Sequence, residues 1–139
     1  MQEREYCFKV KDLEKSKEFC VKNGFNLDYA TEQIRTIYRK SNKTMARITE
    51  DRWGDNVKLS LDFKEDKLNN ESLSIRKESK AVEFTDTDAV LSILDFLGYT
   101  KDNVLVRKRW VYSKGDVVCE IDLYDNAENT IVVSIEGED

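Results

Sequence analysis

Charged side chains recur at every second position along several segments in which polar and apolar residues alternate. Side chains two residues apart on a β-strand project from the same face, so these charges would gather on one face of a sheet. Carboxylates gathered in this way can hold divalent cations, and gathered arginines and lysines can hold phosphate groups. The acids of this predicted face are Glu3, Glu5, Glu78, Glu120, Asp122 and Glu136, and the bases are Lys9, Arg47, Lys58, Lys64, Arg76, Arg107 and Arg109.

Two interpretations of this charged face remain open from the pattern alone. In the first, the face is solvated, and its charges form cross-strand ion pairs worth about 0–1 kcal/mol each. In the second, the sheet curls into a barrel and the charged face lines the interior, where buried charges must pair with one another or hold a ligand. Several arginines and lysines in one interior would suit a polyphosphate.

The composition excludes several classes of site and partner. The 139-residue chain contains no histidine, which rules out Ser-His-Asp and Cys-His triads. A metal would therefore be a hard ion held by carboxylates, such as Mg²⁺, Mn²⁺ or Ca²⁺. The net charge of −5 argues against nucleic acid as a partner. Three widely spaced cysteines, no signal peptide and no apolar run near about 18 residues predict a cytoplasmic protein that does not span a membrane.

Two helices and a series of strands are expected to position these residues. Asp12 is a plausible N-cap for a helix over residues 13–23 that turns Leu13, Phe19 and Cys20 inward. A second helix over residues 88–97 carries the apolar stripe Val90, Ile93, Leu94 and Leu97. The apolar phase changes within residues 73–84, which predicts a bulge near Ser79. Strands are expected over residues 3–10, 25–40, 45–50, 57–64, 73–84, 104–112, 117–124 and 131–136.

Short motifs along nearly the whole chain resemble, in order, those of the CYTH superfamily. This group includes class IV adenylate cyclases, thiamine triphosphatases and inorganic triphosphatases. Its members begin with Glu-x-Glu-x-Lys on the first strand, and Glu3 and Glu5 match the two acids. Further segments similar to family motifs are residues 46–48, 61–64, 75–78, 93–99, 107–109, 121–122 and 134–136.

The resemblance implies a fold and a substrate site. The fold would be α+β, a closed eight-stranded antiparallel triphosphate-tunnel barrel with helices packed on the outside, formed by residues 1–139 as a single domain. By analogy, a homodimer is also expected. Catalytic roles would fall to Glu3, Glu5 and Lys9. The triphosphate would be bound by Arg47, Lys64, Arg76, Arg107 and Arg109.

The resemblance also implies metal-dependent chemistry. Mg²⁺ or Mn²⁺ would support either hydrolysis of an inorganic, nucleoside or thiamine triphosphate or cyclisation of ATP to cAMP. The alternative is a polyphosphate- or nucleotide-binding module without catalysis, because Cys7, Thr49, Lys80 and Ser134 stand where the family has charged residues. The metal ligands would be Glu3, Glu5, Glu78, Asp122 and Glu136.

Overall fold

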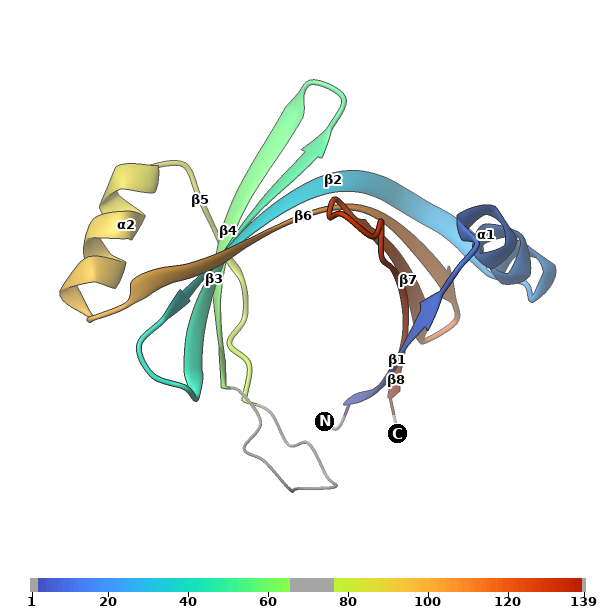
Figure 1. Cartoon of the computed structure of the whole chain (residues 1–139), viewed down its shortest axis with the longest axis horizontal. Coiled ribbons are helices and arrows are strands. Elements are labelled where there is room, and N and C mark those ends of the chain that lie inside the picture. Colours follow the sequence, from blue (N-terminus) through green and yellow to red (C-terminus); the bar gives the residue numbers. More distant parts are fainter. Residues whose placement is uncertain (1–2, 66–76, 139) are drawn as a thin grey trace. The chain divides into compact units, whose positions relative to one another are not determined.

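The structure is a computed structural model, and it describes residues 3–65 and 77–138. None of its helices, over these residues, is long and apolar enough to cross a membrane. Figure 1 shows the elements in chain order, which are β1 (Glu3–Val10), α1 (Leu13–Lys22), β2 (Asn26–Arg39), β3 (Thr44–Trp53), β4 (Asn56–Glu65), β5 (Val82–Phe84), α2 (Thr87–Phe96), β6 (Thr100–Lys114), β7 (Val117–Tyr124) and β8 (Ile131–Glu138).

The strands form one eight-stranded antiparallel sheet in the order β1-β8-β7-β6-β2-β3-β4-β5. This order begins and ends on β1 and β5, so the hydrogen-bonded closure expected of a barrel is not present among the described residues. The chain divides into two compact units. Unit 1 comprises Met1–Gln33 and Val106–Asp139, and unit 2 comprises Ile34–Leu105. The expectation of a single domain over residues 1–139 stays a prediction.

Unit 1 is built on the antiparallel strands β1, β8, β7 and the second part of β6. Asp12 caps α1 by accepting a hydrogen bond from the Lys15 backbone N–H at 3.0 Å, as expected. Of the three α1 residues expected to face inward, Cys20 is buried, Leu13 packs at the margin, and Phe19 is 63% exposed. Lys17 instead covers the Trp110 ring, with its ammonium group 4.0 Å from the ring centroid. The core of the unit contains Cys20, Tyr112, Cys119, Ile121, Ile131 and Val133.

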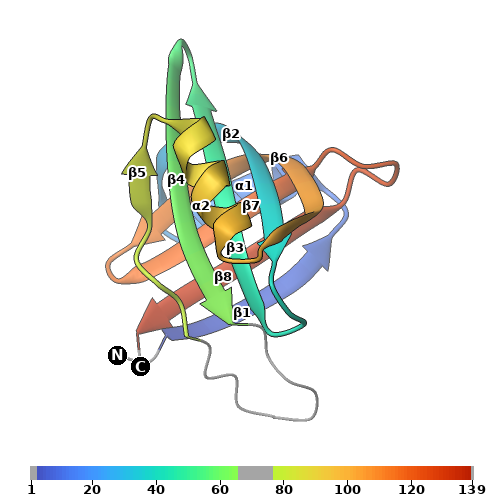
Figure 2. The same ribbon diagram turned by 90° about the vertical axis from the view of Figure 1, so that its left-hand side faces the viewer.

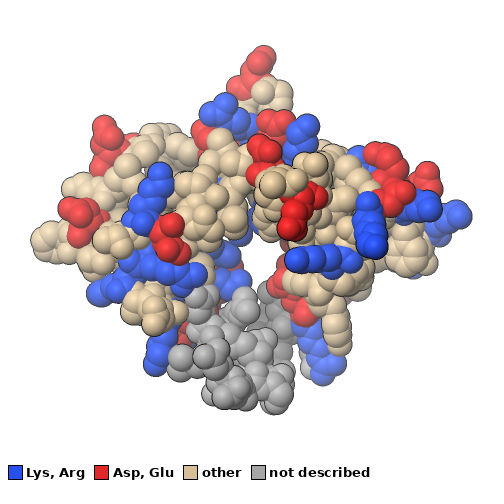
Figure 3. Space-filling view, viewed as in Figure 1, with Lys and Arg blue, Asp and Glu red and all other residues tan. Residues whose placement is uncertain are grey.

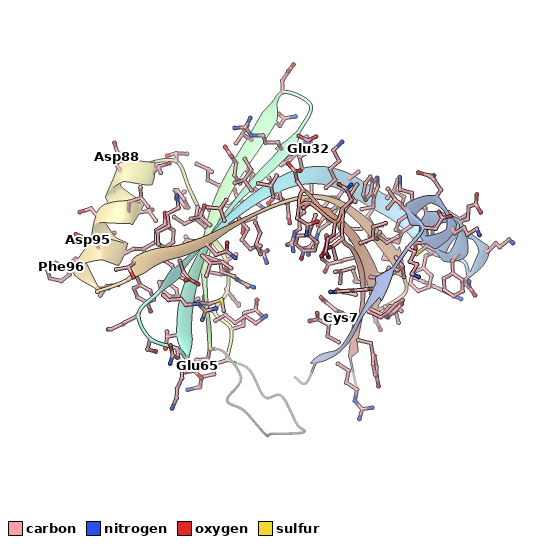
Figure 4. All side chains as sticks on the ribbon, in the orientation of Figure 1. Cys7, Glu32, Glu65, Asp88, Asp95 and Phe96 are labelled. Carbon is pink, nitrogen blue, oxygen red and sulfur yellow. The ribbon has the colours of Figure 1, made fainter. Side chains whose placement is uncertain are left out.

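Unit 2 places α2 against β3 and β4, and Figure 2 shows the helix lying across these strands. Leu94 is 1% exposed and packs with Ala46 and Ile48. The rest of the expected stripe is only partly covered, because Ile93 and Leu97 are 57% and 42% exposed. Phe96 is 90% exposed and projects away from the strands of the unit (Figure 4).

The expected long strand over residues 73–84 is much shorter in the structure. Residues 73–76 lie outside the described residues, and β5 covers only Val82–Phe84. The predicted one-residue slip near Ser79 is confirmed. Glu78 opposes Lys64, whereas Val82 opposes Leu61, so three residues face two between these pairs. The Ser79 hydroxyl accepts the Phe63 backbone N–H at 2.8 Å, which satisfies a strand donor where the ladder is interrupted.

Candidate functional site

The first group of predicted site residues lies on β6 and β7 of unit 1. Arg107 and Arg109 are two residues apart on β6 and therefore share a face. The antiparallel register sets Arg109 opposite Asp122 and Arg107 opposite Tyr124. We call Arg107, Arg109, Glu120 and Asp122 the unit 1 cluster. Two of its members, Arg107 and Asp122, are 5% and 2% exposed, so they do not belong to a solvated face.

Arg109 is held by two carboxylates, which engage all three nitrogens of its guanidinium group. Its Nε and Nη2 atoms donate to the two oxygens of Asp122 at 2.7 and 2.9 Å. Its Nη1 atom lies 2.5 Å from Glu120 Oε2. Burial by itself would lower the pKa of Arg109, but hydrogen bonds to Asp122 and the charges of Asp122 and Glu120 raise it above the usual value. Arg109 is therefore a fixed positive charge with little donor capacity left.

Arg107 is held differently and keeps one donor unused. Its Nε atom donates to Gln33 at 2.8 Å, and its Nη1 atom donates to the Tyr124 hydroxyl at 2.9 Å. Nη1 also lies 3.7 Å from Asp122 Oδ2. The remaining Nη2 atom is buried and has no hydrogen-bond partner among the described residues. Leaving a buried donor unpaired costs about 1–3 kcal/mol, and more for a charged group. A ligand that supplied an acceptor to Nη2 would remove this cost.

The second group lies in unit 2, where Arg47 on β3 opposes Asp62 on β4. Arg47 Nε donates to Asp62 Oδ1 at 3.0 Å, and Nη2 donates both to Asp62 Oδ2 and, at 2.6 Å, to Glu78 Oε1. Burial would lower the pKa of Arg47, and the two carboxylates raise it above its ordinary value. We call these three residues the unit 2 cluster. In this cluster Arg47 is 9% exposed and is paired with two carboxylates.

Several residues of these sites were not predicted from the sequence. Asp62 lies within the motif-like segment 61–64 but had no predicted role. Gln33 and Tyr124 are partners of Arg107. Arg35 donates from Nε to the Thr49 hydroxyl at 3.2 Å, which brings a guanidinium group beside a position where the resemblance led us to expect a charged residue. Gln33 and Arg35 alternate along one segment, and that signal could have identified them.

The remaining predicted phosphate ligands are placed only in part. Lys64 is half-buried, and its side chain has no hydrogen bond or ion pair within the described ranges. Lys9 is exposed on β1 and likewise has no such partner there. Arg76 lies outside the described residues. The phosphate-binding roles of Arg47, Lys64, Arg76, Arg107 and Arg109 stay a prediction.

The predicted metal ligands do not form one set. Asp122 and Glu78 direct their oxygens to arginines. Glu5 lies opposite Glu136 in the β1–β8 register, and for Glu3 only the strand position is described. No group of three metal-binding side chains is found in the described part of the chain. Glu5 and Glu136 are the two predicted ligands that lie directly opposite one another across two strands, and the Mg²⁺ or Mn²⁺ site stays a prediction.

Cys7 lies on β1, between Glu5 and Lys9 on the same face of the strand, and is labelled in Figure 4. Its thiol donates to Glu5 Oε1 at 2.8 Å and lies 3.3 Å from the Ser134 hydroxyl. Burial, and then the hydrogen bond to Glu5, raises the pKa of the Cys7 thiol. Two positions where the family has charged residues, Cys7 and Ser134, thus form a neutral hydrogen-bonded pair across β1 and β8.

Comparison with known proteins identifies the fold. No protein-family model and no curated protein sequence matches the chain. Among solved structures, PH1012 from Pyrococcus horikoshii OT3 is 22% identical with a TM-score of 0.80, covering 99% of this chain and 79% of its own. A candidate adenylate cyclase from Vibrio parahaemolyticus is 12% identical with a TM-score of 0.74, covering 99% and 76%.

A third similar structure belongs to the Mediator head module of Schizosaccharomyces pombe. It is 14% identical, with a TM-score of 0.71, and the match covers 100% of this chain and 83% of that chain. Likenesses at this level of identity establish the fold and no more. The chain therefore has the α+β fold of the CYTH type that its sequence motifs predicted.

Proposed function

We propose that this protein binds a small polyphosphate anion, inorganic or carried by a nucleotide, through the unit 1 cluster. The observation that carries the proposal is the buried Nη2 atom of Arg107, which has no partner among the described residues. A phosphate oxygen is a strong acceptor for a guanidinium donor. Gln33 and Tyr124 hold the other donor atoms of Arg107, so the free N–H is fixed in direction before the anion arrives.

Charge balance limits what this cluster can do. Its two arginines and two carboxylates cancel, so selection of an anion rests on the directed donor of Arg107 and not on net charge. On the face that Figure 3 shows, positive and negative side chains are interspersed. The net charge of the protein is −5. A long nucleic acid would require a continuous basic surface, so a compact anion is the better fit.

Metal-dependent turnover is the second candidate function. The opposed Glu5 and Glu136 favour it, because a divalent cation between two carboxylates could neutralise charge on a bound phosphate. The candidate adenylate cyclase from Vibrio points the same way, since its name implies a triphosphate substrate. Binding stands first because Asp122 and Glu78, two of the five predicted metal ligands, are already paired with arginines.

Isothermal titration calorimetry tests the binding proposal. Tripolyphosphate and ATP are titrated separately into the protein with EDTA and then with Mg²⁺. Arg107→Met should weaken binding about 10- to 150-fold, because it removes a charged hydrogen bond worth about 1.5–3 kcal/mol. Lys108→Met is the matched control, since Lys108 neighbours Arg107 but its side chain is 59% exposed. Circular dichroism checks that both variants fold.

Two results would reject the binding proposal: no heat of binding from either anion, or equal affinities for Arg107→Met and Lys108→Met. Turnover is read separately by ³¹P NMR with Mg²⁺ and with Mn²⁺. Orthophosphate growth would indicate hydrolysis, and pyrophosphate with a cyclic nucleotide would indicate cyclisation. If turnover occurs, Glu5→Gln should abolish it while leaving much of the binding.

A further inference from the structure

Two cysteines from distant parts of the sequence meet in the core of unit 1. Cys20 on α1 and Cys119 on β7 are 99 positions apart in the chain, and each is 3% exposed. The Cys20 thiol donates to the Cys119 sulfur at 3.6 Å, so the two sulfur atoms are in direct contact. Both cysteines belong to the same unit, and neither has a role in the proposed anion site.

The thiol contact lies where α1 is attached to the sheet of its unit. Cys20 is the only buried residue among the ten residues of α1, all of which the structure describes. Its neighbours Phe19 and Val21 are each 63% exposed. The end of the helix is held by Lys114, whose ammonium group donates to the Asn23 carbonyl at 3.0 Å. An element with so few buried side chains opens locally at a lower free energy than the whole protein unfolds.

Two thiols in contact need little movement to become a disulfide. The S–S bond is about 2.05 Å long, so the sulfur atoms must approach by roughly 1.5 Å, which rotation of the side chains and a small shift of α1 would supply. Burial, and then the hydrogen bond with Cys20, raises the pKa of the Cys119 thiol. The thiolate is the reactive form of cysteine. The closed pair therefore reacts slowly, and oxidation depends on opening of α1.

We propose that Cys20 and Cys119 form a reversible intrachain disulfide when the protein meets a hydroperoxide. When α1 opens, the Cys20 thiolate attacks one oxygen of hydrogen peroxide, the O–O bond breaks, and Cys20 becomes a sulfenic acid with release of hydroxide. When α1 closes, the Cys119 sulfur displaces hydroxide from the Cys20 sulfur, and the S–S bond forms. The two thiol protons neutralise the two hydroxides. Overall, two thiols lose two hydrogens and two electrons, and one hydrogen peroxide is reduced to two waters.

The disulfide joins the two separate chain segments of which unit 1 is made, residues 1–33 and residues 106–139. A link between distant positions removes conformational freedom from the unfolded chain, and the effect grows with the length of the loop that it closes. The oxidised protein is therefore more resistant to unfolding than the reduced protein. The disulfide is independent of the proposed anion binding, because Cys119 lies on the opposite face of β7 from Glu120 and Asp122.

Peptide mapping after oxidation tests the disulfide. Reduced protein is treated with hydrogen peroxide, unfolded, alkylated with iodoacetamide and digested with trypsin without reductant. Peptide 18–22 should be joined to peptide 115–139, and dithiothreitol should separate them. Cys7→Ala removes the exposed thiol and should give the same cross-linked pair, whereas Cys20→Ala and Cys119→Ala should give none. Circular dichroism confirms that each variant is folded.

The rate of oxidation tests the role of α1. Lys114→Met removes the hydrogen bond to the Asn23 carbonyl and should speed disulfide formation about 2- to 10-fold, because the helix opens more often without it. Lys43→Met makes the same change at an exposed bend and should leave the rate as it is in the wild-type protein. Equal rates for the two lysine variants would contradict opening of α1 as the route to the disulfide.

Urea denaturation tests the consequence for stability. The unfolding midpoint of the oxidised protein should exceed that of the reduced protein by about 1–3 M urea, and peroxide treatment of Cys20→Ala should give no such increase. Three results would overturn the proposal. They are wild-type protein whose Cys20 and Cys119 both remain open to alkylation after peroxide treatment, native protein that gives the same mixture of cross-links as protein oxidised in urea, and oxidised protein with an unchanged midpoint.

Discussion

Asp122 is shared between two arginines, and this sharing holds the unit 1 cluster together. Its carboxylate accepts two hydrogen bonds from Arg109 and lies 3.7 Å from Arg107. At 2% exposure, it has almost no solvent to replace either partner. Buried charges are tolerated only where each is compensated, so Asp122 is the residue on which the burial of both arginines depends.

We predict that Asp122→Ala lowers the free energy of unfolding by about 3–5 kcal/mol, because it leaves two guanidinium groups without their shared carboxylate. Urea denaturation followed by tryptophan fluorescence measures the change. Asp116→Ala, at an exposed turn, should change stability by no more than about 0.5 kcal/mol. Equal denaturation midpoints for the two variants would mean that Asp122 does not stabilise the buried arginines.

The residues of these sites differ in how far the sequence could predict them. Arg107, Arg109 and Asp122 were predicted because each alternates with apolar residues in its own strand. Such a pattern can be recognised from neighbouring residues alone. Gln33 and Arg35 were missed, although they alternate too, because the strand that pairs with β6 is not encoded locally. Tyr6 and Phe8 show the same limit, because they alternate on the apolar face of β1 and yet are 66% and 47% exposed. Alternation separates two faces, but it does not say which face another element covers.

Helix α2 shows how little of an amphipathic helix needs to be buried. The sequence predicts an N-cap within residues 85–87, and in the structure Asp86 caps the helix by accepting the Ala89 backbone N–H at 3.0 Å. Its apolar stripe was predicted to be wider than it is. The helix packs through the buried Leu94 and the partly buried Val90 and Leu91, while Phe96 is 90% exposed. Periodicity identifies the apolar stripe of a helix, but it does not say how much of that stripe another element covers.

We predict that Leu94→Ala destabilises the protein by about 2–5 kcal/mol, since it removes buried methyl groups and leaves a cavity. Phe96→Ala, on the same helix, should change stability by no more than about 0.5 kcal/mol, because its ring gains little from folding at 90% exposure. Thermal and urea denaturation of both variants provide the measurement. A large loss from Phe96→Ala would show that its ring is covered in solution.

The whole molecule is organised by pairings between distant parts of the sequence. β1 pairs with β8 from Glu3 opposite Glu138 to Val10 opposite Ile131, so the first and last strands are neighbours. By contrast, β3 and β4 are joined by a tight turn at Trp53–Asn56. The strand order could not be derived from local patterns, and the resemblance to family motifs implied only a closed eight-stranded antiparallel barrel. The described residues form the eight-stranded sheet without the expected closure.

We predict that a circular permutant folds if residue 139 is joined to residue 1 by a short flexible linker and new ends are opened between Gly54 and Asp55. The linker joins strands that are already paired, and the new ends lie in an exposed turn, where breaks are best tolerated. The permutant should keep the circular dichroism spectrum of the parent and a single cooperative urea transition.

A second permutant, opened between Ile121 and Asp122, provides the control. These residues are 0% and 2% exposed on β7, which lies between β8 and β6 in the sheet. A break there separates the carboxylate of the unit 1 cluster from the strand that positions it and places charged chain ends in the core. This permutant should lose cooperative unfolding. If the permutant opened at Gly54 also failed, the β1–β8 pairing could not be what brings the two ends of the chain together.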